Sequence, residues 1–203
     1  MRLILVRHGQ TAWNQDRRIQ GCRSDTELSQ RGVEQAERIA SLLKDQRIAA
    51  IYSSPMKRAL DTAQAICQAC RLEVNLAPEL KEIDAGELEG VYADKMERHQ
   101  AIFWAEWLRG NACIPLPGGE SLEELQRRVW RGIVPITTNH PQETVVVVSH
   151  QFVNLAIICR AMGMDLHYVT HLRLDPGAVS ILEISPQGNS LVLFNDTCHL
   201  GTD

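Results

Sequence analysis

Apolar and polar positions recur along the chain with two different periods, one typical of strands and one typical of helices. The strand-like runs are short, rich in apolar or β-branched residues, and bounded by turn residues. The last two of them flank Pro186 and Gly188, which favours a hairpin. The predicted strands are the run that starts at Leu3, then 48–52, 73–76 and 144–149, and a hairpin of 178–184 and 191–194.

The helical segments lie between these strands. Apolar residues at helical spacing cover 33–43, 62–69, 96–108 and 151–162, and a further helix is expected after Ser121. An alternation of strands and helices favours a mainly parallel sheet. The pattern therefore predicts an α/β fold, a three-layer α/β/α sandwich around a mainly parallel, mixed central sheet with one antiparallel edge.

Capping residues predict where the helices begin and end. Ser29 is expected to cap the helix whose apolar positions start at Val33. Ser54 is expected to cap the next helix, with Pro55 at its first helical position. Pro135 is expected to kink or terminate the helix that contains it.

Two predicted strands lead directly into a histidine. The first ends in Arg7-His8, and four consecutive valines lead through Ser149 to His150. Valine on both faces favours a strand of a parallel sheet, and ligands of such sheets bind outside the carboxyl ends of the strands. Neighbouring strands are about 4.8 Å apart, so two imidazoles can face one phosphoryl group. An isolated Arg-His pair would instead favour a structural salt bridge and a core histidine.

An arginine and a carboxylate can reach the same edge. Arg58 follows the second strand by one helical turn, and helical side chains lean toward the N-terminus of their helix. A surface arginine is an equally good interpretation. A carboxylate held near a phosphate would have a raised pKa and could act as a general acid, although a cluster of carboxylates is usually a solvated loop. The candidates are Glu82, Asp84, Glu87 and Glu89.

Composition restricts the class of protein. The 203 residues suit one domain, 1–203, with a helical insertion over the site at about 85–120. A net charge of −4 argues against a nucleic-acid binder that relies on bulk positive charge. The apolar runs are too short for a membrane span, and Arg7-His8 interrupts a signal-peptide pattern, so a cytoplasmic protein is expected. The single CxxC, at 67–70, lies in a helical pattern without a second pair and favours no metal or redox site.

The candidate residues form a dense basic pocket on an acidic protein. Guanidinium groups such as those of Arg7 and Arg58 bind phosphate oxygens through two donors. Phosphoryl transfer places charge on the equatorial oxygens of its transition state, which fixed positive groups stabilise. A neutral histidine can attack phosphorus and form a covalent intermediate that water then cleaves. These residue types therefore predict phosphoryl chemistry.

Several motifs, in their order along the chain, resemble the histidine phosphatase superfamily, in its phosphoglycerate-mutase-like branch. RHG alone would be modest support, but the ordered set is specific and spans nearly the whole chain. The matching segments are 5–11 followed by Trp13-Asn14, Ser53-Ser54-Pro55 with Arg58 and Ala59, Glu82 before Gly86 and Gly90, 118–121, and 148–150.

The resemblance implies a role for each catalytic candidate. His8 would be the nucleophile and Glu82 the proton donor, while Arg7, Arg58 and His150 would bind the phosphate and stabilise charge. The resemblance implies no metal ion and no cofactor. The residues expected to contact substrate are Arg7, Asn14, Gln20, Gly21, Arg58, Glu82, Gln151 and His199.

The tail at 195–201 resembles that of metal-independent phosphoserine phosphatases of this superfamily, which would have a histidine where this chain has Ala85. We therefore expect a metal-independent phosphomonoesterase for a small phosphometabolite, with phosphoserine as the first candidate and a phosphohistidine intermediate. The aromatic segment 103–107 is expected to help select the substrate. Alternatives are a phosphoglycerate mutase, an α-ribazole-phosphate or sugar-phosphate phosphatase, a zinc hydrolase, and a phospholigand-binding module without catalysis. No nucleic-acid or membrane partner is expected, and a homodimer is one option.

Overall fold

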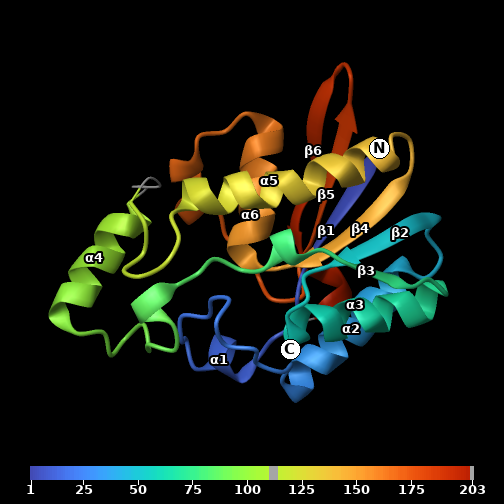
Figure 1. The fold of residues 1–203 in the computed structure, drawn as a ribbon. Coiled ribbons are helices and arrows are strands. Elements are labelled where there is room, and N and C mark those ends of the chain that lie inside the picture. Colours follow the sequence, from blue (N-terminus) through green and yellow to red (C-terminus); the bar gives the residue numbers. More distant parts are fainter. Residues whose placement is uncertain (110–113, 202–203) are drawn as a thin grey trace.

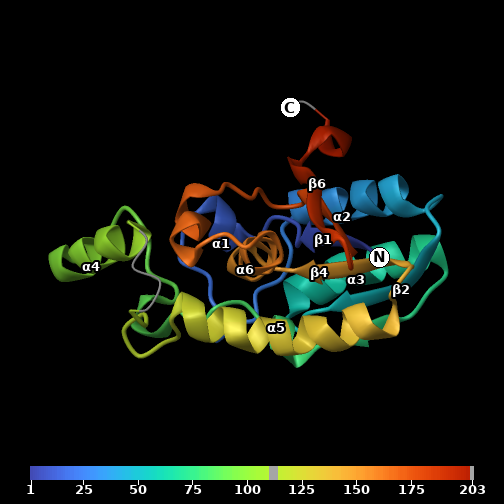
Figure 2. The ribbon, with the colours of Figure 1, turned by 90° about the horizontal axis from the view of Figure 1, so that it is seen from above.

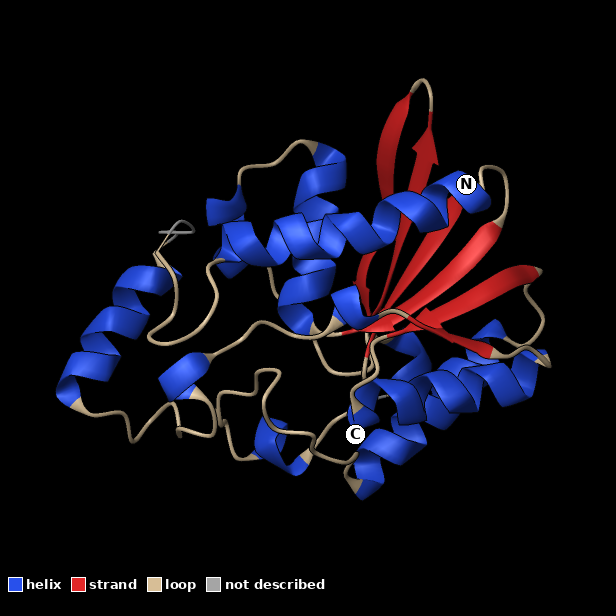
Figure 3. Ribbon diagram, in the orientation of Figure 1, coloured by secondary structure: helices blue, strands red, loops and turns tan. Residues whose placement is uncertain are grey.

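The computed structural model describes residues 1–109 and 114–201, and its centre is a six-stranded sheet of order β3-β2-β4-β1-β5-β6 (Figures 1 and 3). The first four strands in this order are parallel, and β5 is antiparallel to both β1 and β6. This confirms the mixed, mainly parallel sheet with a hairpin at one edge. The strands are β1 (Arg2–Arg7), β2 (Ile48–Ser53), β3 (Val74–Leu76), β4 (Thr144–Ser149), β5 (Val179–Ser185) and β6 (Gly188–Asp196).

Helices cover both faces of the sheet. Helices α2 (Gln30–Leu43) and α3 (Lys57–Cys70) pack on one face, and α5 (Leu122–Asn139) and α6 (Gln151–Met162) pack on the other (Figures 1 and 2). The three-layer α/β/α arrangement is therefore as predicted. No helix in 1–109 or 114–201 is long and apolar enough to cross a membrane.

The positions of β1 and β4 in the centre of the sheet account for the apolar residues in their sequences. Leu5 lies beside Val147 and packs toward α5 and α6, whereas Val6 lies beside Val148 and packs toward α2 and α3. Both faces of these strands are fully buried. The run of four valines in β4 is favourable here because β-branched side chains suit an extended backbone and because both faces of the run are shielded from solvent.

Three helix predictions need correction. Ser29 caps α2 as expected, but Val33 is 42% exposed and does not belong to the buried stripe. Helix α3 begins at Lys57, two residues later than predicted, and Ser54 does not cap it. The side chain of Asp25, from a distant loop, accepts a hydrogen bond from the Lys57 backbone N–H at 2.6 Å. Sequence spacing could not reveal this remote partner.

Pro135 does not terminate α5, which continues to Asn139. The proline is exposed, so the carbonyl that it leaves without a helical donor lies on the solvent side. Ile133 and Ile136 are buried on the opposite side and hold the helix against the sheet. Packing of the apolar face therefore outweighs one lost hydrogen bond.

The short elements gather beyond the carboxyl ends of the parallel strands. They include α1 (Ala12–Gln15), α4 (Arg98–Leu108) and the 3₁₀ helices η1 (Pro78–Leu80), η2 (Gly86–Leu88), η3 (Leu166–His171) and η4 (Cys198–Leu200). Figure 2 shows α4 lying away from the sheet. Part of the helical insertion predicted at about 85–120, residues 110–113, lies outside the described residues.

Candidate active site

The two strand-end histidines meet at the carboxyl edge of the sheet. His8 follows β1 and His150 follows β4, and these strands are parallel neighbours. The two imidazole centroids are 5.2 Å apart at an interplanar angle of 62°. Both side chains are almost completely buried. The structure therefore confirms the juxtaposition on which the phosphoryl hypothesis depends.

Hydrogen bonds define the state of the His8 ring. Nδ1 lies 2.7 Å from the Gly9 carbonyl oxygen, which can only accept, so Nδ1 carries the proton. Nε2 accepts a hydrogen bond from Arg58 Nε at 3.3 Å and therefore presents its lone pair. Burial lowers the pKa of His8 well below its usual 6.5, and the charges of Arg58 and Arg7 lower it further. His8 is thus a neutral imidazole at neutral pH, and its unprotonated Nε2 is the nitrogen that can act as a nucleophile once it exchanges the hydrogen bond from Arg58 for the substrate.

Arg58 is held in place from the second position of α3. Its Nη2 donates to the Gly21 carbonyl at 2.9 Å and its Nη1 to the Ser24 carbonyl at 3.2 Å. The side chain is fully buried, and burial lowers its pKa, while Glu82 opposes the shift. A surface arginine, the alternative interpretation, is wrong. The backbone carbonyls bind the guanidinium without neutralising it, so its charge remains directed at His8.

Arg7 provides a second buried cation at the end of β1. Its Nη1 donates to the Leu174 carbonyl, and burial lowers its pKa to about 10, so it remains charged at neutral pH. Among the described residues, Arg7 Nε and His150 Nδ1 are buried polar atoms without a hydrogen-bond partner. Unpaired polar atoms are costly in a protein interior. Two of them beside two cations fit a site that binds an anion.

His150 is the most enclosed group of the site. Its Nε2 hydrogen-bonds with Ser54 Oγ at 2.8 Å, which explains why Ser54 is engaged here and does not cap α3. Burial lowers the pKa of His150 well below 6.5, and the charges of Arg58 and His8 lower this pKa further. A neutral His150 is therefore available to hydrogen-bond with a phosphate oxygen.

Glu82 is the only one of the four candidate carboxylates that lines the cavity at these histidines. Its Oε1 accepts from the Ile83 backbone N–H at 2.9 Å, and its Oε2 from the Phe152 N–H in the first turn of α6 at 3.3 Å. Burial raises its pKa, and the backbone donors and both arginines oppose the shift. The other carboxylates have different surroundings: Asp84 pairs with Arg23 at 2.7 Å, Glu89 accepts from loop N–H groups, and Glu87 is exposed.

The cavity has a volume of about 370 Å³ and a lining of mixed character. Its titratable and charged lining includes Arg7, His8 and Glu82. Amide side chains also line it, and Asn14 Nδ2 donates to Gln20 Oε1 at 3.3 Å. The remaining lining is largely apolar, from α4, α6, η3 and nearby loops: Ile19, Ile83, Ala85, Ala93, Trp104, Leu108, Leu116, Phe152, Val169, Leu172 and Pro176, with Gln151 and Thr170.

Sequence reasoning missed some lining residues. Arg17 and Arg18 both lie on the cavity wall, although no pattern distinguishes them from the solvated arginines of a loop. Arg18 also stacks over Tyr92, with 4.1 Å between the guanidinium carbon and the ring centroid. The loop after β1 thus contributes charge at the wall as well as the predicted Asn14 and Gln20.

Three residues predicted to contact substrate, Gly21, Arg58 and His199, are not among those that line the cavity. Arg58 lies next to the lining, where its Nε contacts His8 Nε2. Gly21 is buried beside Ile83 and Ala85, and a Cβ at this position would lie 2.7 Å from the Ile83 carbonyl oxygen. Its role in the structure is this close approach, together with the carbonyl that accepts from Arg58. His199 Nε2 contacts the Gly177 carbonyl at 3.0 Å and is not part of the cavity lining. The similarity of the tail to that of the phosphoserine phosphatases did not predict this contact.

The CxxC pair lies away from the active-site cavity, on the helix predicted for it. Cys67 and Cys70 are both reduced and lie on α3, and burial raises the pKa of the Cys67 thiol to about 11. In 1–109 and 114–201 no group of three or more His, Cys, Asp or Glu side chains is arranged to hold a metal ion. The site residues are neutral imidazoles, two buried arginines and a carboxyl group whose pKa is raised by burial.

Comparison with known proteins agrees with this geometry. Residues 3–197 match the sequence profile of the histidine phosphatase superfamily (branch 1). Phosphoserine phosphatase 1 of Hydrogenobacter thermophilus is 36% identical over 202 residues, covering 99% of this chain and 95% of the relative. The metal-independent phosphoserine phosphatase of Arabidopsis thaliana is 38% identical over 203 residues, covering 98% of this chain and 83% of the relative.

A solved structure extends the likeness to three dimensions. A mutant phosphoserine phosphatase from Entamoeba histolytica, in complex with phosphoserine, superposes with a TM-score of 0.88 at 31% identity and covers 98% of both chains. The family match over residues 3–197 includes His8 and His150. By sequence, fold and site geometry, this chain belongs to the histidine phosphatase superfamily (branch 1).

Proposed function

We propose that this chain hydrolyses a small phosphomonoester through a phosphohistidine on His8, with phosphoserine as the first candidate substrate. The observation that carries the proposal is the state of His8: a buried, neutral ring whose unprotonated Nε2 accepts a hydrogen bond from Arg58 Nε. A nucleophile of this kind needs no base to activate it. Family membership makes the chain a phosphoric monoester hydrolase of the histidine type.

The first half of the reaction transfers the phosphoryl group to the protein. Arg7, Arg58 and His150 bind the phosphate oxygens, and His8 Nε2 attacks phosphorus as the bond to the ester oxygen breaks. Glu82, whose pKa is raised by burial, gives a proton to the leaving oxygen. The products of this half are a free alcohol and a phosphohistidine, with Glu82 left as a carboxylate.

The second half releases phosphate. Water attacks the phosphohistidine, Glu82 takes a proton from that water, and the bond between phosphorus and Nε2 breaks. His8 returns to its neutral state and Glu82 to its protonated state, so the cycle closes. The chain's own arginines supply the positive charge and Glu82 moves the proton, so these steps involve no metal ion or cofactor.

Support for phosphoserine comes from the relatives named above and from the lining of the cavity. The amides of Asn14, Gln20 and Gln151 can hydrogen-bond with an amino acid, and Arg17 can attract its carboxylate. Position 85 is an alanine here, packed against Gly21, and offers only a methyl group to the substrate. We therefore assign recognition of the serine portion to the loop after β1.

The alternatives are separated by a single assay. The chain is incubated with phosphoserine, phosphoglycerates, sugar phosphates and α-ribazole phosphate, and free phosphate is measured. Preferential release from phosphoserine is expected. Conversion of 3-phosphoglycerate to 2-phosphoglycerate without phosphate loss would identify a mutase, and tight phosphate binding without turnover would identify a binding module.

Three expectations complete the proposal. The chain acts as one domain over 1–203, and the segment at about 85–120 forms the outer wall of the site through Trp104, Leu108 and Leu116. The compartment is the cytoplasm. A homodimer is one option for its oligomeric state, which size-exclusion chromatography with light scattering would decide.

A further inference from the structure

The backbone of the segment that contains Glu82 is not part of a long helix or of the sheet, so it lacks the hydrogen bonds that these elements provide. It runs from η1 to η2 along the side of α5, and Glu82 itself lies between these two short helices. Leu80 and Ile83 anchor it in the core, while the backbone carbonyls of 79–82 need donors from elsewhere. Ser149 Oγ donates to the Leu80 carbonyl at 2.7 Å. The other three carbonyls share a single donor residue.

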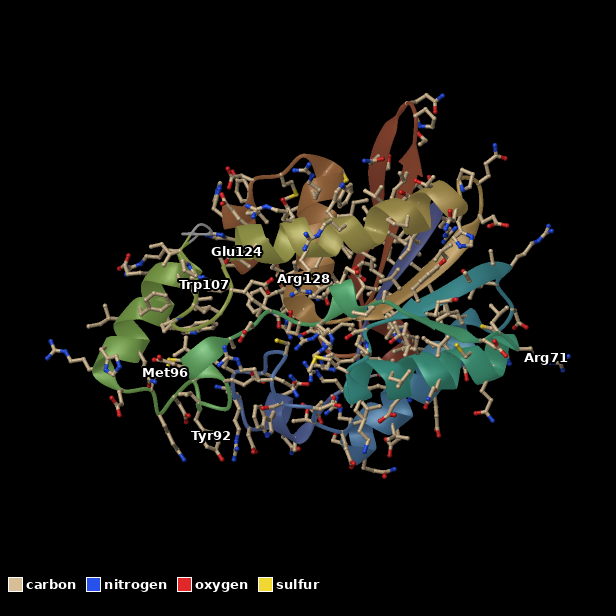
Figure 4. All side chains as sticks on the ribbon, in the orientation of Figure 1. Arg71, Tyr92, Met96, Trp107, Glu124 and Arg128 are labelled. Atoms are coloured by element: carbon tan, nitrogen blue, oxygen red, sulfur yellow. The ribbon has the colours of Figure 1, made fainter. Side chains whose placement is uncertain are left out.

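That residue is Arg128, on α5. Its Nη1 donates to the carbonyls of Glu79 and Lys81, at 2.7 and 2.9 Å. Its Nη2 donates to the carbonyl of Glu82, at 3.3 Å. Figure 4 shows Arg128 between α5 and the segment that contains η1. One guanidinium therefore holds the backbone immediately before and at Glu82.

Glu120 fixes this guanidinium and extends the same contact beyond Glu82. Arg128 Nε and Nη2 donate to the two carboxylate oxygens of Glu120, at 3.0 and 2.8 Å. The Glu120 backbone N–H donates to the Asp84 carbonyl at 2.9 Å, and Glu120 Oε2 accepts from the Asp84 N–H at 3.3 Å. The pair thus holds the chain on both sides of the proposed proton donor.

We propose that Arg128, oriented by Glu120, is a positioning residue for Glu82 and so controls proton transfer to the leaving group without contacting the substrate. This inference rests on the proposed function, because it assigns a task only if Glu82 is the proton donor. Neither side chain lines the cavity of the histidines.

The geometry explains why an arginine occupies this position. Five donors in a rigid plane allow contacts with three carbonyls and one carboxylate together, which a lysine ammonium cannot reproduce. Proton transfer is sensitive to such support, because a misplacement of about 1 Å can reduce a rate by about 100-fold. Loss of Arg128 would release three carbonyls on the segment whose movement displaces Glu82.

The test uses the dependence of proton donation on the leaving group. An alkyl phosphate such as phosphoserine needs a proton on its leaving oxygen, whereas p-nitrophenyl phosphate releases a stable anion and does not. The rate of the first turnover is measured for both substrates, so that only formation of the phosphohistidine is observed. The variants are Arg128→Met, Arg128→Lys, Glu82→Gln as a reference and Arg127→Met as a control from the exposed neighbouring position.

Arg128→Met should lower the alkyl first-turnover rate by about 100-fold and leave the aryl rate nearly unchanged, as Glu82→Gln should. Arg128→Lys should show the same selective loss to a smaller degree, and it serves as the test if the methionine variant does not fold. Arg127→Met should change neither rate.

An equal loss for both substrates would overturn the inference in favour of a purely structural role, and so would no loss for either. Failure of the proposed function has a different signature. In that case the unmodified chain would form no phosphohistidine, or Glu82→Gln would not separate the two substrates.

Discussion

The two ends of the active-site cavity are built in different ways. We use inner end for Arg7 and His8, which line the cavity, together with Arg58 and His150, which contact His8. All four side chains are buried and come from the ends of β1 and β4 or the start of α3. At the outer end, the wall comes from loops, α4 and η3, and its side chains are mostly apolar and partly exposed. The inner end is thus attached to the sheet, while much of the outer end lies beyond it.

The difference separates chemistry from selection. A phosphoryl group is the same in every ester, so groups that stabilise its transition state can be fixed rigidly in the core. The alcohol differs between substrates, and loops change more easily than packed strands. We therefore expect changes at the inner end to lower the rate for every ester, and changes at the outer end to act on binding of the alcohol portion.

Removing the nucleophile should have the largest effect. His8→Ala should reduce phosphate release by about 10⁴-fold or more, and it should abolish the acid-labile label seen after quenching with labelled substrate. His199→Ala is the matched control, because that side chain contacts the Gly177 carbonyl and does not line the cavity. A label that persists in His8→Ala would reject His8 as the nucleophile.

The next largest effect is expected for Arg58→Lys. Lysine keeps the charge but loses the planar set of donors that contacts Gly21, Ser24 and His8 together. We expect kcat to fall by about 100-fold or more for alkyl and aryl esters alike. Lys57→Met, at the exposed preceding position, should leave kcat intact. A loss confined to one ester would contradict the separation of the two ends.

The pH dependence should show both titrating groups of the inner end. Reaction requires neutral His8, so the rate falls as pH drops through its pKa, which lies well below 6.5. It also requires protonated Glu82, so the rate falls as pH rises through a pKa above 4.5. Outside these limits the first-turnover rate for phosphoserine should change by about tenfold per pH unit.

The aryl ester provides the control for this profile. Its first turnover does not need the proton from Glu82, so only the acid limb should remain after correction for ionisation of the ester itself. An acid limb at or above pH 6.5 would show that His8 is not held neutral by its surroundings.

The smallest effect is expected at the outer wall. Trp104 lines the cavity and stacks on Trp107 with ring centroids 5.2 Å apart, and Trp107 in turn packs against Phe152. Figure 4 shows Trp107 on α4, away from the sheet. Trp104→Ala should raise KM for the preferred ester by about tenfold with little change in kcat. The control is Ile102→Ala, at a 55% exposed position of the same helix.

A large fall in kcat for Trp104→Ala, without a rise in KM, would mean that the outer wall also takes part in the chemical step. The assignment of selection to the loops and of chemistry to the sheet would then be wrong.

Much of the inner end could be predicted because it depends on local pattern. Apolar runs that stop at Arg7-His8 and Ser149-His150 predict buried strands and the residues that lie at their ends. Adjacent parallel strands then have to bring those ends together. The predicted start of α3 is wrong for two reasons. The Lys57 N–H donates to the side chain of Asp25, which is distant in sequence, and the Ser54 side chain hydrogen-bonds with His150.

The sequence by itself determined the α/β architecture and the identity of the phosphoryl-binding groups, since both follow from hydrophobic periodicity and from motifs beside strands. The resemblance pointed to Glu82 among the four carboxylates, but residue patterns alone left the choice open, and the tertiary structure places Glu82 on the cavity wall. Only the tertiary structure decided that Arg17 and Arg18 line the wall and that His199 contacts the Gly177 carbonyl away from the cavity lining. The same is true of the contact between Arg128 and the backbone at Glu82. These features depend on the paths of loops across the ends of the strands, and loop paths are set by contacts between residues far apart in the chain.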